Sequence, residues 1–136
     1  MKNNKIICGF AGIGKSHLAK NTVGVVDLES TPFNKNWDLY TDVAIHMQKN
    51  GYTPLLSCHK ELREELKKKN ADFIIVIPFF ALKQDYLQRY KNRGNTDTFI
   101  KMFDEKWENF IEEIIKSGDP YEIMDSNYLT IKLHDK

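Results

Sequence analysis

Residues 6–16 read Ile6-Ile7-Cys8-Gly9-Phe10-Ala11-Gly12-Ile13-Gly14-Lys15-Ser16, and this stretch decides the fold. From Gly9 onward it fits the phosphate-binding pattern G-x-x-x-x-G-K-[ST], and the three residues before it are apolar, as in a buried strand. Glycines in such a loop let backbone N–H groups close around phosphates, and the helix that follows points its positive end at them. The stretch therefore predicts a strand, a phosphate loop and a helix that bind a nucleoside triphosphate.

The pattern also assigns roles within the loop. Lys15 is expected to reach the β- and γ-phosphates, and Ser16 to bind Mg²⁺ through its hydroxyl. The positions expected to contact the nucleotide are Gly9, Ala11, Gly12, Ile13, Gly14, Lys15, Ser16 and His17. His17 is included because it follows the loop on the first helix. No set of metal ligands accompanies it.

Length and composition limit the class of protein. A chain of 136 residues suits one domain, here 1–136, with a core of its own. The net charge of +1, with no basic face or tail, argues against a nucleic-acid partner. The longest apolar run, 73–82, contains Pro78 and is too short to cross a bilayer, and no secretory signal precedes the first strand.

The two cysteines, Cys8 and Cys58, indicate no disulfide framework and suit a reducing compartment. We interpret both as small buried hydrophobic residues. We therefore expect a cytoplasmic protein with a small-molecule partner and no membrane partner, either a monomer or a homodimer.

Strand-like and helix-like segments alternate along the chain, which is typical of a parallel α/β sheet. We expect strands at 5–9, 23–28, 53–57, 73–77 and 121–124. We expect helices at 14–21, 41–50, 59–69, 82–91 and 98–117. The last helix carries an apolar stripe at helical spacing, which we interpret as core: Phe99, Phe103, Trp107, Phe110, Ile111 and Ile114. The fold class predicted is α/β, with a parallel sheet of about five strands flanked by helices.

An acidic pair, Asp27 and Glu29, follows the second expected strand, and strand alternation turns both carboxylates to one side. Open α/β sheets bind ligands at this end of their strands. Asp27 is expected to help hold Mg²⁺ through water, and Glu29 to bind a phosphoryl acceptor or take its proton. The alternative is that Asp27 caps a turn and Glu29 is simply solvated.

Arg89 and Arg93 are four residues apart, so a helix places both guanidinium groups on one face. Phosphoryl transfer needs rigid cationic groups around the moving phosphate. We expect a small mobile lid near 89–98 that brings both arginines over the nucleotide. The alternative is a solvated helix face.

The phosphate loop, the acidic pair and the strand-Pro-helix segment with R-x-x-x-R resemble the P-loop kinases of nucleotides and small metabolites, the adenylate-kinase-like superfamily. The resemblance covers nearly the whole chain in element order, and the phosphate loop is its one specific motif. It implies a three-layer fold with strand order 2-3-1-4-5, and ATP and Mg²⁺ as cofactors. It also implies that Arg89 stacks on adenine and that Arg93 contacts the phosphates of ATP.

The acceptor is less closely defined by this resemblance. Ser57 and Cys58, with Arg63 further along, look like the corresponding segment of gluconate kinases, and Asp27-Leu28-Glu29 looks like the D-x-D of shikimate kinases. Nucleoside monophosphate kinases instead use an arginine in the region of Arg63 to hold the acceptor's phosphate. The chain is also short, as are nucleotide kinases predicted in phages and their bacterial hosts. We therefore place a nucleotide acceptor first, bound by Arg63 and Glu29.

The family inserts its acceptor-binding segment where this chain has residues 30–50. Trp37 is expected either to stack on a base or to anchor the loop on the sheet. His59 follows the third strand at the expected crevice, where capping or exposure is the simpler role. Asp125 to Asn127 read as a turn, and the tail from Tyr128 is left unassigned.

The sequence thus predicts an ATP-dependent kinase that phosphorylates a nucleoside or deoxynucleoside monophosphate. One alternative is a kinase of a small hydroxyl metabolite or nucleoside. Another is an ATP-binding regulatory module with little turnover of its own. Pro78 stands where a motor or switch ATPase would carry an acid after its strand, which favours a kinase over such a module.

Overall fold

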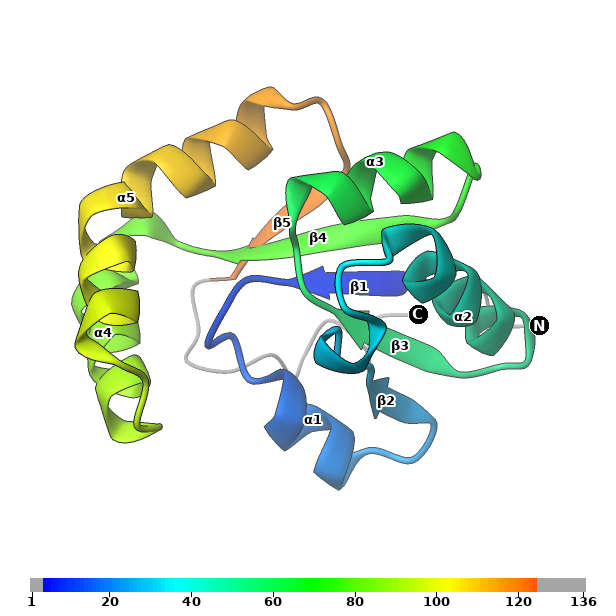
Figure 1. Cartoon of the computed structure of the whole chain (residues 1–136), viewed down its shortest axis with the longest axis horizontal. Coiled ribbons are helices and arrows are strands. Elements are labelled where there is room, and N and C mark those ends of the chain that lie inside the picture. The colour runs from blue at the N-terminus through cyan, green and yellow to red at the C-terminus, as the bar shows by residue number, and fades with distance from the viewer. Residues whose placement is uncertain (1–3, 125–136) are drawn as a thin grey trace.

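Five strands form a single parallel sheet in the computed structural model, which describes residues 4–124. In spatial order the strands are β2 (Val25–Asp27), β3 (Thr53–Leu56), β1 (Ile6–Gly9), β4 (Phe73–Pro78) and β5 (Tyr121–Met124) (Figure 1). Ile7 of the central strand pairs with Leu55 on one side and Ile74 on the other. The predicted α/β class, the parallel sheet and the order 2-3-1-4-5 are confirmed.

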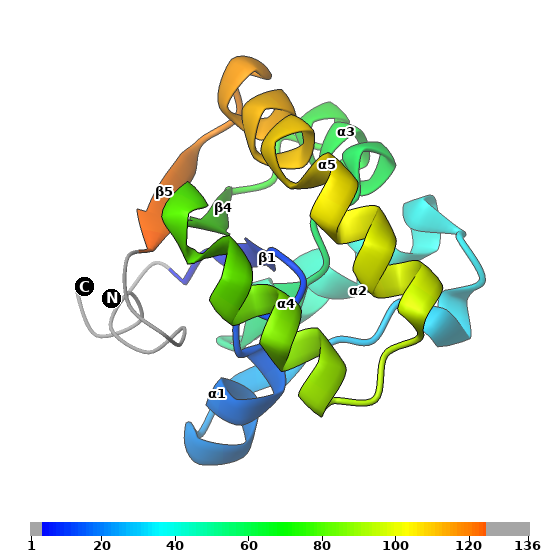
Figure 2. The ribbon, with the colours of Figure 1, turned by 90° about the vertical axis from the view of Figure 1, so that its left-hand side faces the viewer.

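Helices flank this sheet and connect its strands. They are α1 (Lys15–Asn21), α2 (Trp37–Lys49), α3 (Lys60–Lys68), α4 (Lys83–Asn92) and α5 (Asp97–Lys116). In Figure 1, α2, α3 and α5 lie in front of the sheet, whereas α1 lies beside its β2 end. Figure 2 shows α4 alongside α5, close to the loop that leaves β1. That loop is the predicted phosphate loop, so α4 reaches the candidate site directly.

The second strand and the second helix differ from the prediction at their starts. β2 begins at Val25 instead of residue 23, because the side chain of Val23 is fully exposed and Gly24 has φ of +85°. α2 begins four residues before the expected position. The side chain of Asn36 accepts a hydrogen bond from the backbone N–H of Leu39 at 3.1 Å and so caps the helix. Trp37 consequently lies on a helical turn instead of in a loop.

The apolar stripe of α5 is core, as predicted. Phe103, Trp107, Ile111 and Ile114 are buried, and Phe99 and Phe110 are partly buried against them. The indole N–H of Trp107 donates to the carbonyl oxygen of Phe80 at 2.9 Å.

Phe10, inside the phosphate loop, packs edge-on against Trp107 with ring centroids 5.3 Å apart. The loop is therefore anchored to the same core as the longest helix. Of the two free cysteines, Cys8 is buried and Cys58 is half-buried.

Within residues 4–124, no helix has both the length and the apolar character that a membrane span requires. The turn expected at Asp125–Asn127 and the tail that follows it lie outside the described residues.

Candidate phosphate-binding site

The loop between β1 and α1 has the backbone conformation that its glycines permit. Gly12 has φ of +83° and Gly14 has φ of +104°, a region that L-residues with a side chain adopt at a cost. Gly14 is also the N-cap of α1, and the N–H of Leu18 donates to its carbonyl oxygen at 3.0 Å. The motif glycines thus form the tight turn that delivers Lys15 and Ser16 onto the first helical turn.

Lys15 extends back along the loop. Its ammonium donates a hydrogen bond to the carbonyl oxygen of Gly9 at 3.2 Å. Desolvation by burial lowers the pKa of Lys15 below its ordinary 10.5, while the nearby Cys58 and Asp27 act in the opposite direction. A partly desolvated ammonium in a cavity is suited to binding an anionic group such as phosphate.

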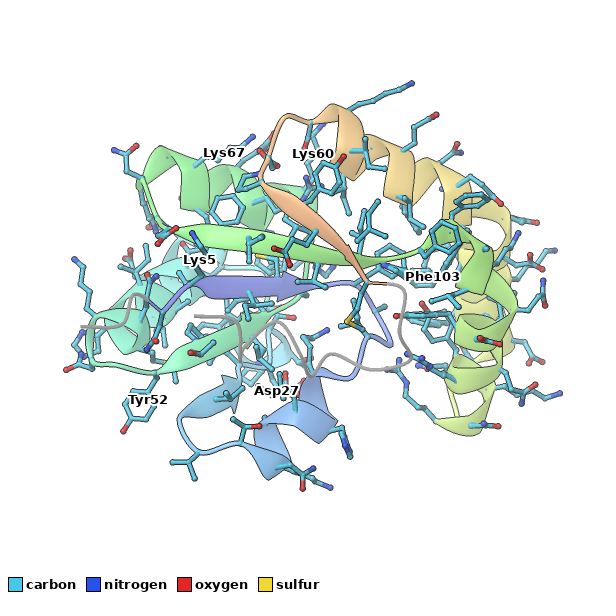
Figure 3. The ribbon with its side chains drawn as sticks, turned by 180° about the vertical axis from the view of Figure 1, so that it is seen from behind. Lys5, Asp27, Tyr52, Lys60, Lys67 and Phe103 are labelled. Carbon is cyan, nitrogen blue, oxygen red and sulfur yellow. The ribbon has the colours of Figure 1, made fainter. Side chains whose placement is uncertain are left out.

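Ser16 and Asp27 meet between the first helix and the end of β2. The Ser16 hydroxyl donates to Oδ2 of Asp27 at 2.7 Å, and Asp27 lies beside α1 in the view from behind (Figure 3). Residues 4–124 contain no group of three or more His, Cys, Asp or Glu side chains that could hold a metal ion. Bound Mg²⁺ keeps several waters and takes phosphate oxygens as ligands, so a hydroxyl backed by a carboxylate is a fitting protein contribution.

Two side chains of α4 hold the loop from the other side. The Tyr90 hydroxyl donates to the carbonyl oxygen of Ala11, and Nη1 of Arg89 donates to that of Gly12, both at 2.7 Å. A Cβ placed on Gly12 would lie 2.7 Å from Cε1 of Tyr90. The guanidinium of Arg89 also lies over the ring of Tyr86, 4.2 Å from its centroid.

The arginine-bearing helix packs against the loop in this structure, and the small mobile lid near 89–98 stays a prediction. Tyr86 and Tyr90 of α4 are both fully buried. The guanidinium of Arg93, one turn after Arg89, donates from Nε and Nη2 to Oδ1 of Asn95, at 3.2 and 3.0 Å. Within 89–98, residues 89–92 are the last turn of this docked helix.

A cavity of about 770 Å³ opens above the loop, which is within the usual range for sites of nucleotide-sized ligands. Its walls bring together most of the residues singled out from the sequence: Ala11, Gly12, Gly14, Lys15, Ser16, His17, Asp27, Glu29, Arg89 and Arg93. Ile13 is buried beneath the loop, and Gly9 ends β1. Neither lines the cavity.

Other residues that line this cavity were not named as site residues from the sequence, although several lie in the expected acceptor-binding segment 30–50: Leu28, Ser30, Thr31, Tyr40, Ser57, Asn92, Asn95 and Phe99. Ser57 follows β3 next to the phosphate loop, and that position was a usable signal. Tyr40 is fully buried, and its hydroxyl donates to the carbonyl oxygen of Leu28 at 2.5 Å. Its approach to the cavity depends on the start of α2 at Trp37, which the prediction placed four residues later.

A second cavity, of about 450 Å³, adjoins the first and shares Ser30 and Thr31 with it. Trp37 lines this second cavity, together with Asn34, Lys35, His59 and Glu61. The rings of Trp37 and His59 face each other with centroids 5.1 Å apart and planes inclined by 31°. Nδ1 of His59 is 2.9 Å from the hydroxyl of Ser57. Trp37 thus lies near, but not in, the cavity above the phosphate loop.

Arg63 does not reach either cavity, and its expected role as an acceptor ligand is corrected. Its side chain is only 2% exposed, with Nη2 donating to Glu113 at 2.5 Å and Nη1 to Asp119 at 3.1 Å. Nε donates to the carbonyl oxygen of Cys58. These contacts commit the guanidinium to joining α3 to the end of α5 and to the turn that precedes β5, which is a structural role.

No family model matches the chain, and no curated protein matches it significantly. Among solved structures, the tunicamycin resistance protein of Deinococcus radiodurans is similar, with a TM-score of 0.61 and 16% sequence identity. The match covers 98% of this chain and 91% of that one. At this identity the likeness shows a shared fold and nothing finer.

Proposed function

We propose that this protein is an ATP-dependent kinase that transfers the γ-phosphoryl group of Mg-ATP to a small-molecule acceptor. The observation that carries the proposal is the hydrogen bond from Ser16 to Asp27, formed at the end of a phosphate loop of sequence G-x-x-x-x-G-K-S. Lys15 and the guanidinium groups of Arg89 and Arg93 line the same cavity. Phosphoryl transfer depends on this kind of positioning and charge stabilisation.

Each of these side chains has a task in the proposed reaction. Lys15 and the loop amides would hold the β- and γ-phosphates, and Arg89 and Arg93 would face the nucleotide from α4. When bound, Mg²⁺ supplies positive charge next to the transferred phosphate. Ser16 would be its protein ligand, with Asp27 orienting the hydroxyl from behind. A cytoplasmic location, where ATP is available, belongs to the same proposal.

The geometry favours a hydroxyl acceptor over a monophosphate. A monophosphate acceptor needs a cation for its own phosphate, and Arg63, the arginine expected there, is buried in ion pairs. A hydroxyl acceptor needs a carboxylate to take its proton. Asp27 already accepts the Ser16 hydrogen bond, and Glu29 is an exposed carboxylate in the cavity wall. We therefore propose a small hydroxyl metabolite or nucleoside as acceptor, with Glu29 as its base.

A nucleoside or deoxynucleoside monophosphate is the second candidate. Lys35 lines the second cavity and could neutralise an acceptor phosphate in place of Arg63. A monophosphate would require no base, because its attacking oxygen is already an anion. The ATP-binding regulatory module is the third candidate, in which the same loop binds ATP without an acceptor.

An acceptor panel tests these candidates. Purified protein is given Mg-ATP with single nucleosides, sugars, sugar acids or nucleoside monophosphates, and ADP release is measured. Tunicamycin is included because the structural neighbour is named for resistance to it. Release stimulated by hydroxyl compounds supports the proposal, whereas stimulation by monophosphates alone selects the second candidate.

Two further outcomes concern the nucleotide itself. ATP turnover that no acceptor stimulates, and that appears only when a protein partner is added, would select the regulatory module. Lys15→Met should abolish tight ATP binding. An unchanged affinity in that variant would mean that the loop is not the site.

A further inference from the structure

Ser57 lies at the carboxyl end of β3, next to the start of the phosphate loop. In the parallel pairing of β3 with β1, Leu56 stands opposite Cys8, so the next residues along the two strands are Ser57 and Gly9. The carbonyl oxygen of Gly9 accepts the hydrogen bond of the Lys15 ammonium, and Ser57 lines the cavity above the loop. A serine hydroxyl therefore lies in the cavity wall, close to the lysine proposed to hold the β- and γ-phosphates.

The hydroxyl of Ser57 is paired with the imidazole of His59. Its oxygen lies 2.9 Å from Nδ1 of His59, which is the distance expected between a nucleophile and its general base. Tyr40 also contacts Ser57, but the phenol donates its own proton to the carbonyl oxygen of Leu28. The imidazole is therefore the basic group beside the serine.

The imidazole of His59 is held in one orientation and is neutral at neutral pH. Its ring stacks on the ring of Trp37, with centroids 5.1 Å apart and planes inclined by 31°. Burial lowers the pKa of His59 below its ordinary 6.5. The positive charges of Lys15 and Lys35 act in the same direction, and Glu61 acts against them. A neutral imidazole can accept a proton, and the influence of Lys15 shows that its ammonium lies near this pair.

A hydroxyl next to a base that is itself held by a third group is the arrangement that activates serine as a nucleophile. We propose that Ser57 is a self-phosphorylation site, with ATP at the phosphate loop as the donor and His59 as the base. The proposal rests on the ATP binding proposed above. In the transfer, Oγ of Ser57 bonds to the γ-phosphorus as the bond from that phosphorus to the β,γ-bridging oxygen breaks. ADP leaves with the bonding electrons, and the serine proton passes to Nδ1 of His59.

The product of this transfer would occupy the site that formed it. A phosphoserine carries about −1.5 to −2 charges at neutral pH, and at position 57 it would compete for the Lys15 ammonium with the γ-phosphate of the next ATP. The modified protein should therefore bind a fluorescent ATP analogue at least about tenfold more weakly than the unmodified protein. An unchanged affinity would overturn this block, even where Ser57 is modified.

Mass spectrometry gives a direct test of the modification. Purified protein is incubated with Mg-ATP alone, and its intact mass is followed with time. We expect each chain to gain a single phosphate, which peptide mapping assigns to Ser57. Ser30 and Thr31 line the same cavity and serve as internal controls that should carry none. The rate per molecule should be independent of protein concentration, whereas a rate that rises with concentration would overturn transfer within one chain.

Variants assign the roles of the two residues. Ser57→Ala should gain no phosphate, and Ser57→Thr, which keeps a hydroxyl, should still gain one at that position. His59→Asn should slow the gain at least about a hundredfold, because an amide can accept the serine's hydrogen bond but cannot take its proton. His59 is the N-cap of α3, and asparagine is a preferred N-cap residue, so the helix should persist. His46→Asn is the matched control, because His46 lines neither cavity.

The outcomes distinguish this inference from the kinase proposal. If an acceptor stimulates ADP release while Ser57 gains no phosphate, the self-transfer is wrong and the kinase stands. If Ser57 is modified and no acceptor stimulates ADP release, the self-transfer stands and the small-molecule acceptor is wrong. If the ATP analogue does not bind and no phosphate is gained, both proposals fail at the nucleotide site. Lys15→Met, purified in the same way, should gain no phosphate, and a gain in that variant would point to a contaminating kinase and overturn the self-transfer.

Discussion

The hydroxyl of Ser16 lies 2.7 Å from Oδ2 of Asp27 and donates to it, which ties the first turn of α1 to the end of β2. The two residues are eleven positions apart and come from separate elements. Their contact joins the phosphate loop to the acidic side of the cavity, where the proposed metal and the proposed acceptor would meet.

Asp27→Asn should weaken ATP binding only when magnesium is present. The change removes the negative charge that accepts the hydrogen bond of the Ser16 hydroxyl. A hydrogen bond to a charged group is worth about 1.5–3 kcal/mol, so the affinity for Mg-ATP should fall roughly tenfold to a hundredfold. Isothermal titration with Mg²⁺ and with a chelator measures it. Asp72→Asn, which removes an exposed partner of Lys5, serves as the control. An equal loss without magnesium would contradict the assigned role.

Gly12→Ala should damage the site more than its backbone strain alone explains. A side chain at this positive φ costs about 1–2 kcal/mol, and the new Cβ would also meet the ring of Tyr90 at 2.7 Å. Gly118→Ala is a matched control, with φ of +84° and nothing within 4 Å of the added atom. Chemical unfolding should show a larger loss for Gly12→Ala, accompanied by weaker ATP binding. Equal losses in the two variants would mean that α4 moves aside freely.

Tyr90→Phe should lower the stability of the fold, whereas Tyr86→Phe should not. The Tyr90 hydroxyl donates to Ala11, and its removal should lower the free energy of unfolding by about 1 kcal/mol. Among the described residues, the buried hydroxyl of Tyr86 has no well-aligned hydrogen-bond partner, and the Arg89 guanidinium is the polar group next to it. Removal of this hydroxyl should be neutral or stabilising, since an unsatisfied buried group carries a desolvation penalty. Urea unfolding of both variants decides the point, and a loss of stability in Tyr86→Phe would show that its hydroxyl is bonded.

Arg63→Met should destabilise the fold without altering acceptor recognition. The substitution leaves the buried carboxylate of Asp119 with only Lys67 as its ion-pair partner, and breaking a buried pair costs about 3–5 kcal/mol. If the variant does not fold, Glu113→Gln removes the half-exposed partner more gently. Acceptor KM of the folded protein should equal that of the wild type. A rise in KM with normal stability would restore Arg63 as a substrate ligand.

At alkaline pH, Lys15 should take up a proton when ATP binds. Its pKa is lowered by burial in the free protein, and phosphates favour the charged ammonium, so affinity should fall as pH rises through the lowered pKa. The contribution of Lys15 to the stability of the fold depends on pH in the opposite direction. The unfolded chain binds more protons between the lowered pKa and the ordinary 10.5, so the contribution of Lys15 to stability rises with pH there. Titration calorimetry in two buffers of different ionisation enthalpy counts the protons, and Lys15→Met should take up none.

The features that could be predicted from the sequence are those that depend on residues close together along the chain. The phosphate loop needs glycines at fixed spacing, and the sheet needs short β-rich runs between helices, so both can be recognised in a single chain. The start of α2 was also readable, because Asn36 is a preferred N-cap residue, but the segment was interpreted as a loop that contains Pro32.

The features that could not be predicted depend on partners far along the chain. Glu113 and Asp119 lie 50 and 56 positions from Arg63, and nothing near Arg63 indicates that its charge will be buried with them. The docking of Tyr90 on the phosphate loop likewise joins residues 79 positions apart. Two arginines at helical spacing predict that both lie on one face of a helix. Only the fold shows that this helix packs against the phosphate loop.

The contacts from α4 to the phosphate loop also bear on when, during synthesis, the loop reaches its final shape. Carbonyl groups of Ala11 and Gly12 are bonded by side chains that are synthesised 79 and 77 residues later. A nascent chain that has emerged only as far as β4 carries the complete motif, but its loop still lacks the helix that fixes its shape. If the loop binds a nucleotide as proposed, this ability is acquired late in synthesis, once α4 has folded against the loop.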